Sequence, residues 1–359
     1  MNVAFVADHS SDFLAATVEG LKKAFVAAGH SLGETADAAT GIVVNVTRGL
    51  APRANYLRKS KDTFVLTLAE TTTAPADVRK TAYMALVRTL ANLTAFVVRD
   101  QDSIATWLVT PELGCKEVAH DEDYARTLAA QALVLAGAHL IISNDFMPDL
   151  PQSLWQGDAV TRAMAEVGRE LERLNLLPSI LPIRELLPER DLRLIMKLYG
   201  LRQVSYGNMS ARHDQRSFWM TGRGVNKGQL ERIGKDILLV TGYDRERQAI
   251  LLSVPTEFDP EARVSVDAIE HFQLYRDFPG IGAIIHLHAW IDGIASTHQS
   301  YPCGSQELAD EVLTLVRSAP DPANAVVGLR NHGIVATGPD LRTVFRRLDG
   351  KLIREVPMA

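Results

Sequence analysis

Short apolar runs alternate with amphipathic stretches through the first 140 residues. The alternation predicts strands separated by helices, and therefore an α/β layer with a mainly parallel sheet. The predicted strands lie at 3–7, 41–46, 63–68, 94–98, 104–110 and 139–142. The predicted helices lie at 14–26, about 75–92 and about 121–137. We expect a Rossmann-like N-terminal domain, although its first strand-to-helix turn contains neither a G-x-G-x-x-G nor a P-loop motif.

A break in this pattern follows at Asp145–Pro151, where two prolines interrupt a mixed stretch. A charged amphipathic helix is predicted over 159–177, and prolines at 178, 182 and 188 follow it. We therefore predict three segments: a domain over 1–150, a helical, Pro-rich linker over 151–187 and a second domain over 188–359.

The second domain mixes strands, tight turns and helices, which favours a sheet flanked by helices. A helix is expected from Pro188, a strand–turn–strand block over 204–212, and a strand and loop over 218–225. Further strands are predicted at 237–241, 250–254 and 281–288, with a turn at 242–244 and a helix from Ser265 to about Asp277.

The strand candidate 281–288 ends in His286-Leu287-His288. Side chains alternate along a strand, so the two imidazoles point the same way, and two polar residues on a half-exposed strand would give the same pattern. His332 stands in Asn331-His332-Gly333, before another apolar run. With this third imidazole, a three-histidine metal site with an open position becomes the better interpretation. Zinc suits it best, while manganese, iron and cobalt also accept nitrogen ligands.

Three ordered motifs resemble the class II aldolase/adducin family: Val204–Arg212 (VSYGNMSAR), HLHA at 286–289 and LRNHG at 329–333. The resemblance runs from about 188 to the C-terminus and implies an α/β/α fold. It implies that His286, His288 and His332 hold a divalent metal that acts as a Lewis acid on a hydroxy-ketone. It places the acid/base residue at Asp267, where the family has a glutamate. Asp267 would otherwise cap and charge a helix N-terminus, and Glu270 is the substitute.

The resemblance also implies an anion site. Gly207 and Asn208 match the family's Gly-Asn turn, whose backbone N–H groups can cradle an anion. The family's Thr/Ser-Gly and Ser-Ser pairs align with Arg223-Gly224 and with Ser265-Val266. An arginine pairs well with carboxylate or phosphate, so we expect a small anionic substrate; a solvated loop arginine is the alternative.

The chain departs most from the family after His288, where only fifteen residues precede Gly304. The family's longer insert carries a tyrosine that donates a proton. His298 and Tyr301 could replace it or could be turn residues, and Cys303 is expected to be packing rather than a nucleophile.

Composition narrows the remaining choices. A net charge of −5 gives no reason to expect nucleic-acid or anionic-membrane binding. Two cysteines are too few for a disulfide framework, no stretch reaches the length of a membrane span, and the start lacks a signal-peptide pattern. We expect a cytoplasmic homo-oligomer.

We predict a metal-dependent, aldolase-like lyase that acts on a small anionic hydroxy-carbonyl compound through a metal-stabilised enolate. An epimerase, dehydratase, decarboxylase or iron oxygenase on the same site, or a non-catalytic adducin-like interaction module, are the alternatives.

Overall fold

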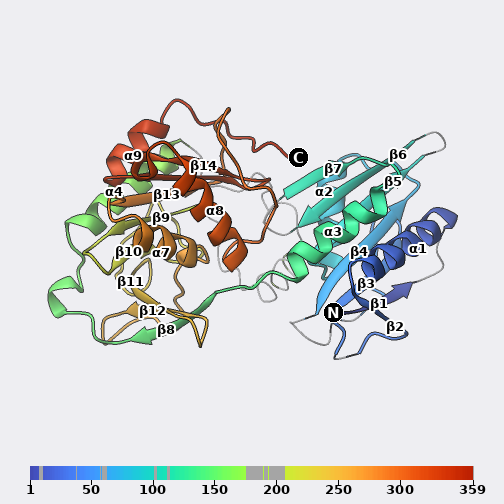
Figure 1. The fold of residues 1–359 in the computed structure, drawn as a ribbon, viewed down its shortest axis with the longest axis horizontal. Coiled ribbons are helices and arrows are strands. Elements are labelled where there is room, and N and C mark those ends of the chain that lie inside the picture. Colours follow the sequence, from blue (N-terminus) through green and yellow to red (C-terminus); the bar gives the residue numbers. More distant parts are fainter. Residues whose placement is uncertain are drawn as a thin grey trace. The chain divides into compact units, whose positions relative to one another are not determined.

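The chain divides into two compact units in the computed structural model (Figure 1). The structure describes residues 1–7, 11–37, 39–56, 58, 63–100, 103–110, 114–174, 189, 193 and 207–358. The first unit comprises Met1–Gly137, Leu181–Leu201 and Met358–Ala359, and the second Ala138–Ile180 and Arg202–Pro357. No helix in the described ranges is long and apolar enough to cross a bilayer.

The first unit is built on one sheet, whose described strands run in the order β2-β1-β3-β4-β5-β6-β7. Strands β1 to β5 pair in parallel, and β6 and β7 are antiparallel additions at one edge. The strands are β1 (Asn2–Ala7), β2 (Ser31–Gly33), β3 (Ile42–Arg48), β4 (Phe64–Thr71), β5 (Leu93–Arg99), β6 (Ile104–Thr110) and β7 (Gly114–Val118). The helices are α1 (Asp12–Ala27), α2 (Val78–Arg88) and α3 (Tyr124–Ala136).

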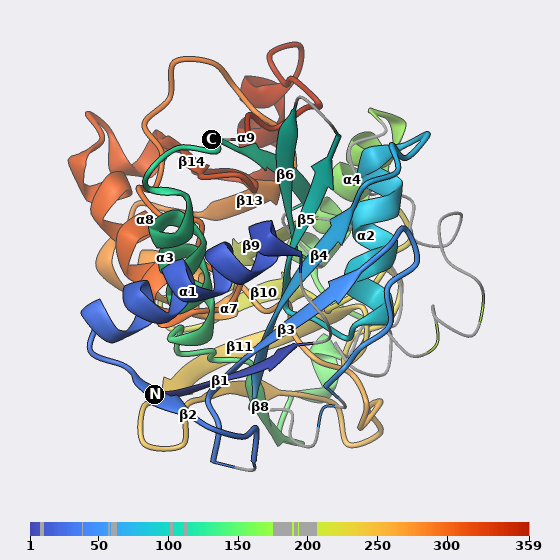
Figure 2. The same cartoon turned by 90° about the vertical axis from the view of Figure 1, so that its right-hand side faces the viewer.

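Helices cover both faces of this sheet. Leu14, Leu21 and Phe25 of α1 and Leu128 of α3 pack into one core with the sheet, and Figure 2 shows α2 on the opposite side. Strands β3 and β4 are buried on both faces, which explains their continuous apolar runs. The predicted α/β layer is therefore confirmed, while the Rossmann-like class stays a prediction.

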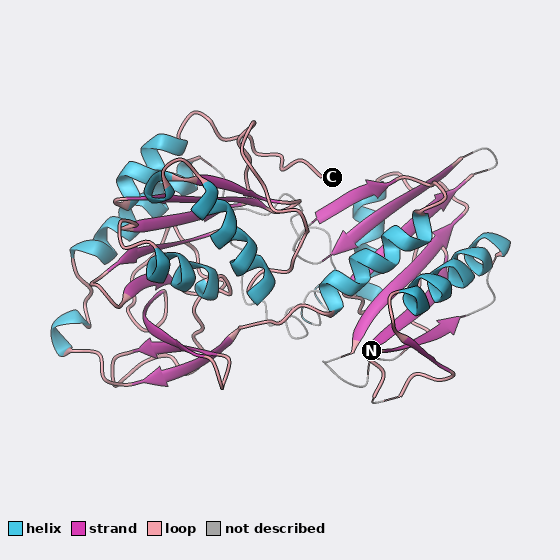
Figure 3. Ribbon diagram, viewed as in Figure 1, coloured by secondary structure: helices cyan, strands magenta, loops and turns pink. Residues whose placement is uncertain are grey.

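The second unit holds a sheet whose described strands run in the order β14-β15-β13-β9-β10-β11-β12-β8. Figure 3 draws the strands in magenta and the helices in cyan. All neighbours pair antiparallel except β12 and β8. The strands are β8 (Ser143–Met147), β9 (Asn208–Arg212), β10 (Phe218–Thr221), β11 (Ile237–Asp244), β12 (Ala249–Ser253), β13 (Ala283–Leu287), β14 (Val326–Leu329) and β15 (Gly333–Gly338). The helices are α4 (Ala159–Arg173), α7 (Ala268–Asp277), α8 (Gln306–Ser318) and α9 (Leu341–Leu348), with short 3-10 turns η1 (Gln152–Leu154) and η2 (Pro322–Asn324).

Two apolar cores sandwich the second sheet. Helices α7 and α8 bury their apolar residues on one face, and α4 and α9 on the other. The expected sheet with helices on both faces is thus observed.

The boundary between the two units differs from the predicted one. The strand predicted at 139–142 is wrong, since the strand is β8 and belongs to the second sheet. The break predicted at Asp145–Pro151 begins inside that strand. Helix α4, assigned to the linker, packs Met164, Val167 and Leu171 into the second core. The described part of the predicted linker therefore belongs to the second unit, while the helix predicted from Pro188 lies outside the described residues except for 189 and 193.

One smaller correction concerns β11. The turn predicted at 242–244 is part of this strand, which continues to Asp244 through a bulge between Val240 and Gly242. The chain turns over residues 245–248 instead.

Candidate metal and active site

Two histidines come from the end of the central strand β13. His286 lies in the strand, between Asn208 of β9 and Val335 of β15 in the two ladders, and His288 follows directly after it. Both imidazoles therefore lie at the same end of the sheet.

The third histidine reaches this end because of a close backbone approach. His332 lies in the turn between β14 and β15, after Asn331, whose φ is +59°. A Cβ on Gly333 would lie 2.1 Å from the carbonyl oxygen of Leu287. Only glycine permits this approach without displacing the backbone, and it brings His332 beside His288.

The three imidazoles form a compact cluster, in which His286 and His332 are buried and His288 is partly buried. One ring nitrogen from each lies within 4.8 Å of those of the other two. The Nε2 atoms of His288 and His332 are 2.8 Å apart, and the ring centroids are separated by 4.4 to 5.1 Å.

The chemistry of these nitrogens fits a metal ion. His286 donates its Nδ1 proton to the carbonyl oxygen of Ile334 at 3.0 Å, which leaves the lone pair on Nε2. That Nε2 is buried and has no hydrogen-bond partner among the described residues. Burial lowers the pKa of all three imidazoles, well below the usual range for His288 and His332. Neutral imidazole is the form that binds metals.

Asp267 lies beside the cluster in a role other than capping. It occupies the N-cap position of α7, but its side chain makes no capping hydrogen bond there. Instead its Oδ2 accepts a hydrogen bond from Nδ2 of Asn208 at 2.6 Å, and the Asp267 charge acts on the buried His286 ring. The helix begins at Ala268 rather than at the predicted Ser265. Ser265 lies in a turn before the helix, where its carbonyl oxygen accepts a hydrogen bond from the Ala268 amide.

Gly207 positions the turn that carries Asn208. Gly207 has a φ of +78°, and a Cβ there would lie 2.5 Å from the carbonyl oxygen of His286. This glycine therefore brings the turn against β13, so that Asn208 can reach Asp267. A role of the turn in binding an anion stays a prediction.

Two buried ionisable groups complete the surroundings. Glu270 is 2% exposed, and both of its carboxyl oxygens have no hydrogen-bond partner within the described part of the chain. Burial, and then the Asp267 charge, raise its pKa well above the usual range, which favours the protonated form. Lys227 is 3% exposed, and burial lowers its pKa to about 7 against the opposing pull of Asp267.

Sequence analysis missed Lys227. In the sequence it stands between Asn226 and Gly228 and looks like a solvated turn residue. A Cβ on Gly168 would lie 1.9 Å from its carbonyl oxygen, so α4 lies directly on this turn. Since α4 was assigned to a linker, no local signal could have revealed this burial.

The other predicted substrate residues lie near one another on neighbouring segments. The Arg223 amide donates to the carbonyl of Arg263 at 2.7 Å, and the Ser265 amide donates to that of Thr221 at 3.1 Å. Gly224 has a φ of +68°. Contact between these residues and a substrate stays a prediction.

The short loop after His288 places a thiol beside the histidine cluster. His298 is exposed, and Tyr301 packs against the core formed with α7 and α8. The Sγ atom of Cys303 lies 3.3 Å from Nε2 of His332. Cys303, expected to be packing rather than a nucleophile, therefore has an imidazole beside its thiol.

Comparison with known proteins identifies a family segment that overlaps this site. A family model described as "Class II Aldolase and Adducin N-terminal domain" matches residues 191–297, which include Asp267, His286 and His288; His332 lies beyond them. The chain therefore carries a class II aldolase segment in its C-terminal half, as predicted.

Two curated relatives match this chain over about the same length as the family model does. Methylthioribulose-1-phosphate dehydratase of Stenotrophomonas maltophilia (strain R551-3) is 35% identical over 97 residues, which are 27% of this chain and 39% of the relative. The protein of the same name from Xanthomonas campestris pv. campestris (strain B100) is 32% identical over 97 residues, with the same coverage. The chain thus spans about two fifths of the length of these relatives.

Two solved structures are similar at lower identity. YgbL of Escherichia coli is 16% identical with a TM-score of 0.36, covering 53% of this chain and 84% of its own. L-fuculose-1-phosphate aldolase from Thermus thermophilus is 18% identical with a TM-score of 0.32, covering 52% and 86%.

Proposed function

We propose that the second unit is a metal-dependent, aldolase-like lyase that acts on a small anionic hydroxy-carbonyl compound. The observation that carries the proposal is the convergence of three imidazoles, two of them buried and one partly buried, beside the hydrogen-bonded pair Asn208 and Asp267. His286, His288 and His332 would hold a divalent metal, and we propose zinc because three imidazoles suit it. When bound, such a metal supplies Lewis acidity at the substrate carbonyl.

The protein's own groups would move the proton. The Asp267 carboxylate is the proposed base that takes a proton from the carbon next to the carbonyl, and Asn208 fixes its orientation through the 2.6 Å hydrogen bond. Glu270 lies one turn further along α7. Burial raises its pKa well above the usual range, so its protonated form is favoured. Lys227 supplies a cationic partner for the Asp267 charge when it is protonated. Arg223 is proposed to pair with the anionic group of the substrate.

Dehydration on the same site is the second candidate. It is favoured by the local similarity to two proteins named methylthioribulose-1-phosphate dehydratase. Both reactions pass through an enolate. Dehydration forms it by removing the proton from the carbon beside the carbonyl and then breaks a carbon–oxygen bond, whereas aldol cleavage forms it by breaking a carbon–carbon bond and then returns a proton to that carbon.

For the first unit, we propose the Rossmann-like class, supported by its parallel strands with helices on both faces. The cytoplasmic location and the homo-oligomer stay predictions.

The test is proton exchange in deuterated water. Metal-loaded and chelator-treated protein would be incubated with phosphorylated and carboxylated hydroxy-ketones, and the products followed by NMR. The proposal expects metal-dependent deuterium incorporation next to the carbonyl. Carbon–carbon cleavage would then identify an aldolase, and loss of water a dehydratase. Absence of exchange from every substrate with metal-loaded protein would contradict both candidates and favour a non-catalytic module.

A further inference from the structure

The loop that joins His288 to α8 is fastened to the segment that carries His332. The Thr297 amide donates to the carbonyl of Gly328 at 3.0 Å, and the Arg330 amide donates to the Thr297 hydroxyl at 2.9 Å. The Ser300 hydroxyl donates to the carbonyl of Arg330 at 3.3 Å. These bonds hold the loop against the turn that ends in His332.

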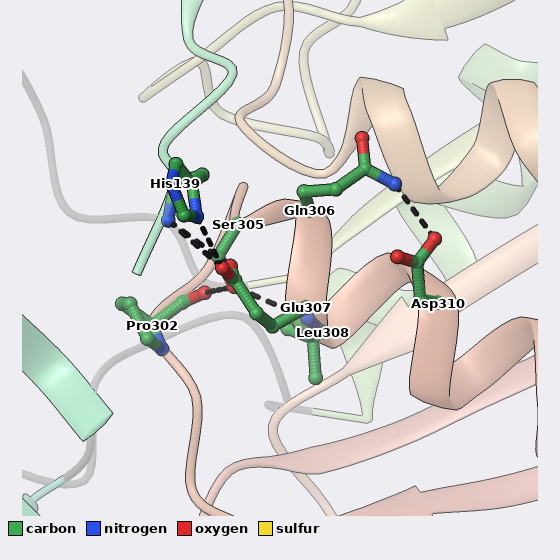
Figure 4. Close-up of polar contacts among 7 residues, drawn as sticks. All are labelled: His139, Pro302, Ser305, Gln306, Glu307, Leu308 and Asp310. Carbon is green, nitrogen blue, oxygen red and sulfur yellow. Dashed lines mark hydrogen bonds and ion pairs between the residues drawn. The ribbon is translucent and has the colours of Figure 1, made fainter. Parts of the chain in front are cut away.

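The far end of the loop is also fixed. Gly304 has a φ of +75°, and a Cβ there would lie 2.9 Å from the carbonyl oxygen of Val266. The Ser305 hydroxyl accepts from the Leu308 amide at 3.2 Å, caps α8 and donates to the carbonyl of Pro302 at 2.8 Å (Figure 4). Cys303 therefore lies between two anchored residues, with little freedom to move its backbone.

The thiol of Cys303 faces the histidine cluster. Its Sγ is 3.3 Å from Nε2 of His332 and 3.8 Å from Nδ1. The same Nε2 lies 2.8 Å from Nε2 of His288. Nearby, the buried Nε2 of His286 has no hydrogen-bond partner in the described part of the chain. The sulfur thus borders the point where the three nitrogens converge.

We infer that Cys303 supplies a thiolate as the fourth ligand of the metal centre, an inference that rests on the proposed three-histidine site. With metal–nitrogen bonds of about 2.0–2.1 Å and a metal–sulfur bond of about 2.3 Å, adjacent tetrahedral ligand atoms lie roughly 3.4–3.6 Å apart. The 3.3 Å separation of Sγ from His332 fits that geometry. Sγ borders the three-nitrogen cluster rather than belonging to it, so coordination would require a change of the Cys303 side-chain rotamer.

This ligand has two chemical consequences. A thiolate favours zinc or cobalt over magnesium and manganese, and the thiol proton passes to solvent when the metal binds. The thiolate also fills the position that an open three-histidine site offers to substrate. A substrate must therefore displace the sulfur or bind as a fifth ligand.

Cobalt substitution tests the inference without any activity assay. Wild type, Cys303→Ser, Cys303→Ala and the control Cys115→Ser would be loaded with cobalt(II), and metal content and absorption spectra measured. Cys115 lies in β7 of the first sheet and leaves the second sheet untouched. We expect a thiolate-to-cobalt charge-transfer band in the near ultraviolet for wild type and Cys115→Ser only. We expect zinc affinity to fall by at least ~10-fold in both Cys303 variants, the lower end of losses at metal-site residues.

The outcomes separate the two proposals. Full cobalt content in wild type without the band, or with an equal band in Cys303→Ser, overturns the sulfur ligand and leaves the histidine site standing. Wild-type protein that binds no cobalt overturns both. Circular dichroism of the Cys303 variants checks folding, and the wild-type spectrum decides the question even if both variants fail to fold.

Discussion

Asp267→Asn is the substitution that separates a catalytic carboxylate from a helix-terminal one. Asparagine can keep the contact with Asn208, because its side-chain oxygen can accept the same hydrogen bond that Oδ2 accepts at 2.6 Å. No capping bond is lost, since Asp267 makes none. The change therefore removes the charge and the basicity while it preserves the shape of the site.

The expected losses differ greatly in size. Removal of a general base costs ~10²–10⁴-fold in rate. If Asp267 were only a helix-terminal carboxylate, its replacement by asparagine would cost at most ~1 kcal/mol of folding free energy, because asparagine caps as well as aspartate. Turnover or proton exchange should thus collapse in Asp267→Asn, while metal content stays at the wild-type level.

The assay measures exchange rate, metal content and urea unfolding side by side. Asp340→Asn is the matched control, because Asp340 is the N-cap of α9 and does accept its capping bond, from the Thr343 amide at 2.9 Å. An Asp267→Asn protein that retains more than about a tenth of wild-type activity would refute the role as base, given the expected loss of at least ~10²-fold. The proton transfer would then pass to Glu270.

Three further predictions follow from close contacts and buried charge. Gly333→Ala places a Cβ 2.1 Å from the Leu287 carbonyl oxygen, so we expect a stability loss of ~1–3 kcal/mol and a ~10–100-fold loss of metal affinity. Gly280→Ala, with its nearest contact at 3.5 Å, should change neither in the same urea and zinc titrations. Lys227 has a folded pKa of about 7, against 10.5 when unfolded, so unfolding takes up a proton between these values and stability rises with pH. In metal-free protein, Lys227→Met should flatten the rise in unfolding free energy above pH 7 by up to ~1.4 kcal/mol per pH unit, and parallel curves would contradict it. Arg223→Ala should raise KM for the anionic substrate ~10- to 100-fold, as loss of a charge-assisted bond of ~1.5–3 kcal/mol predicts, whereas an unchanged KM would make it a loop arginine.

The sequence predicted those parts of the site that depend on local pattern. Strand alternation placed His286 and His288 on one face, and His332 was added as the third imidazole before an apolar run. The close approach of Gly333 to Leu287, which brings His332 to them, is seen only in the structure. The position of Asp267 came from resemblance to a family, and its contact with Asn208 spans 59 residues. No periodicity encodes a contact at that separation.

The parts that could not be predicted depend on tertiary packing. The segment of strand β8 (Ser143–Met147) begins with three polar residues and resembles a loop in the sequence. It becomes a strand only through its pairing with β12. Helix α4 has an apolar face that could pack on any core, and its placement on the turn of Lys227 buries that lysine. The thiol of Cys303 meets His332 across 29 residues of chain.

The metal content of the purified chain tests the central claim most directly. Elemental analysis of wild type should give close to one divalent metal per chain, because His286, His288 and His332 offer one compact set of nitrogens. The double variant His286→Ala with His288→Ala should lose that metal, since His332 alone cannot hold it. A double variant that keeps the wild-type metal content would show that the ion binds elsewhere, and a wild type without metal would remove the centre altogether.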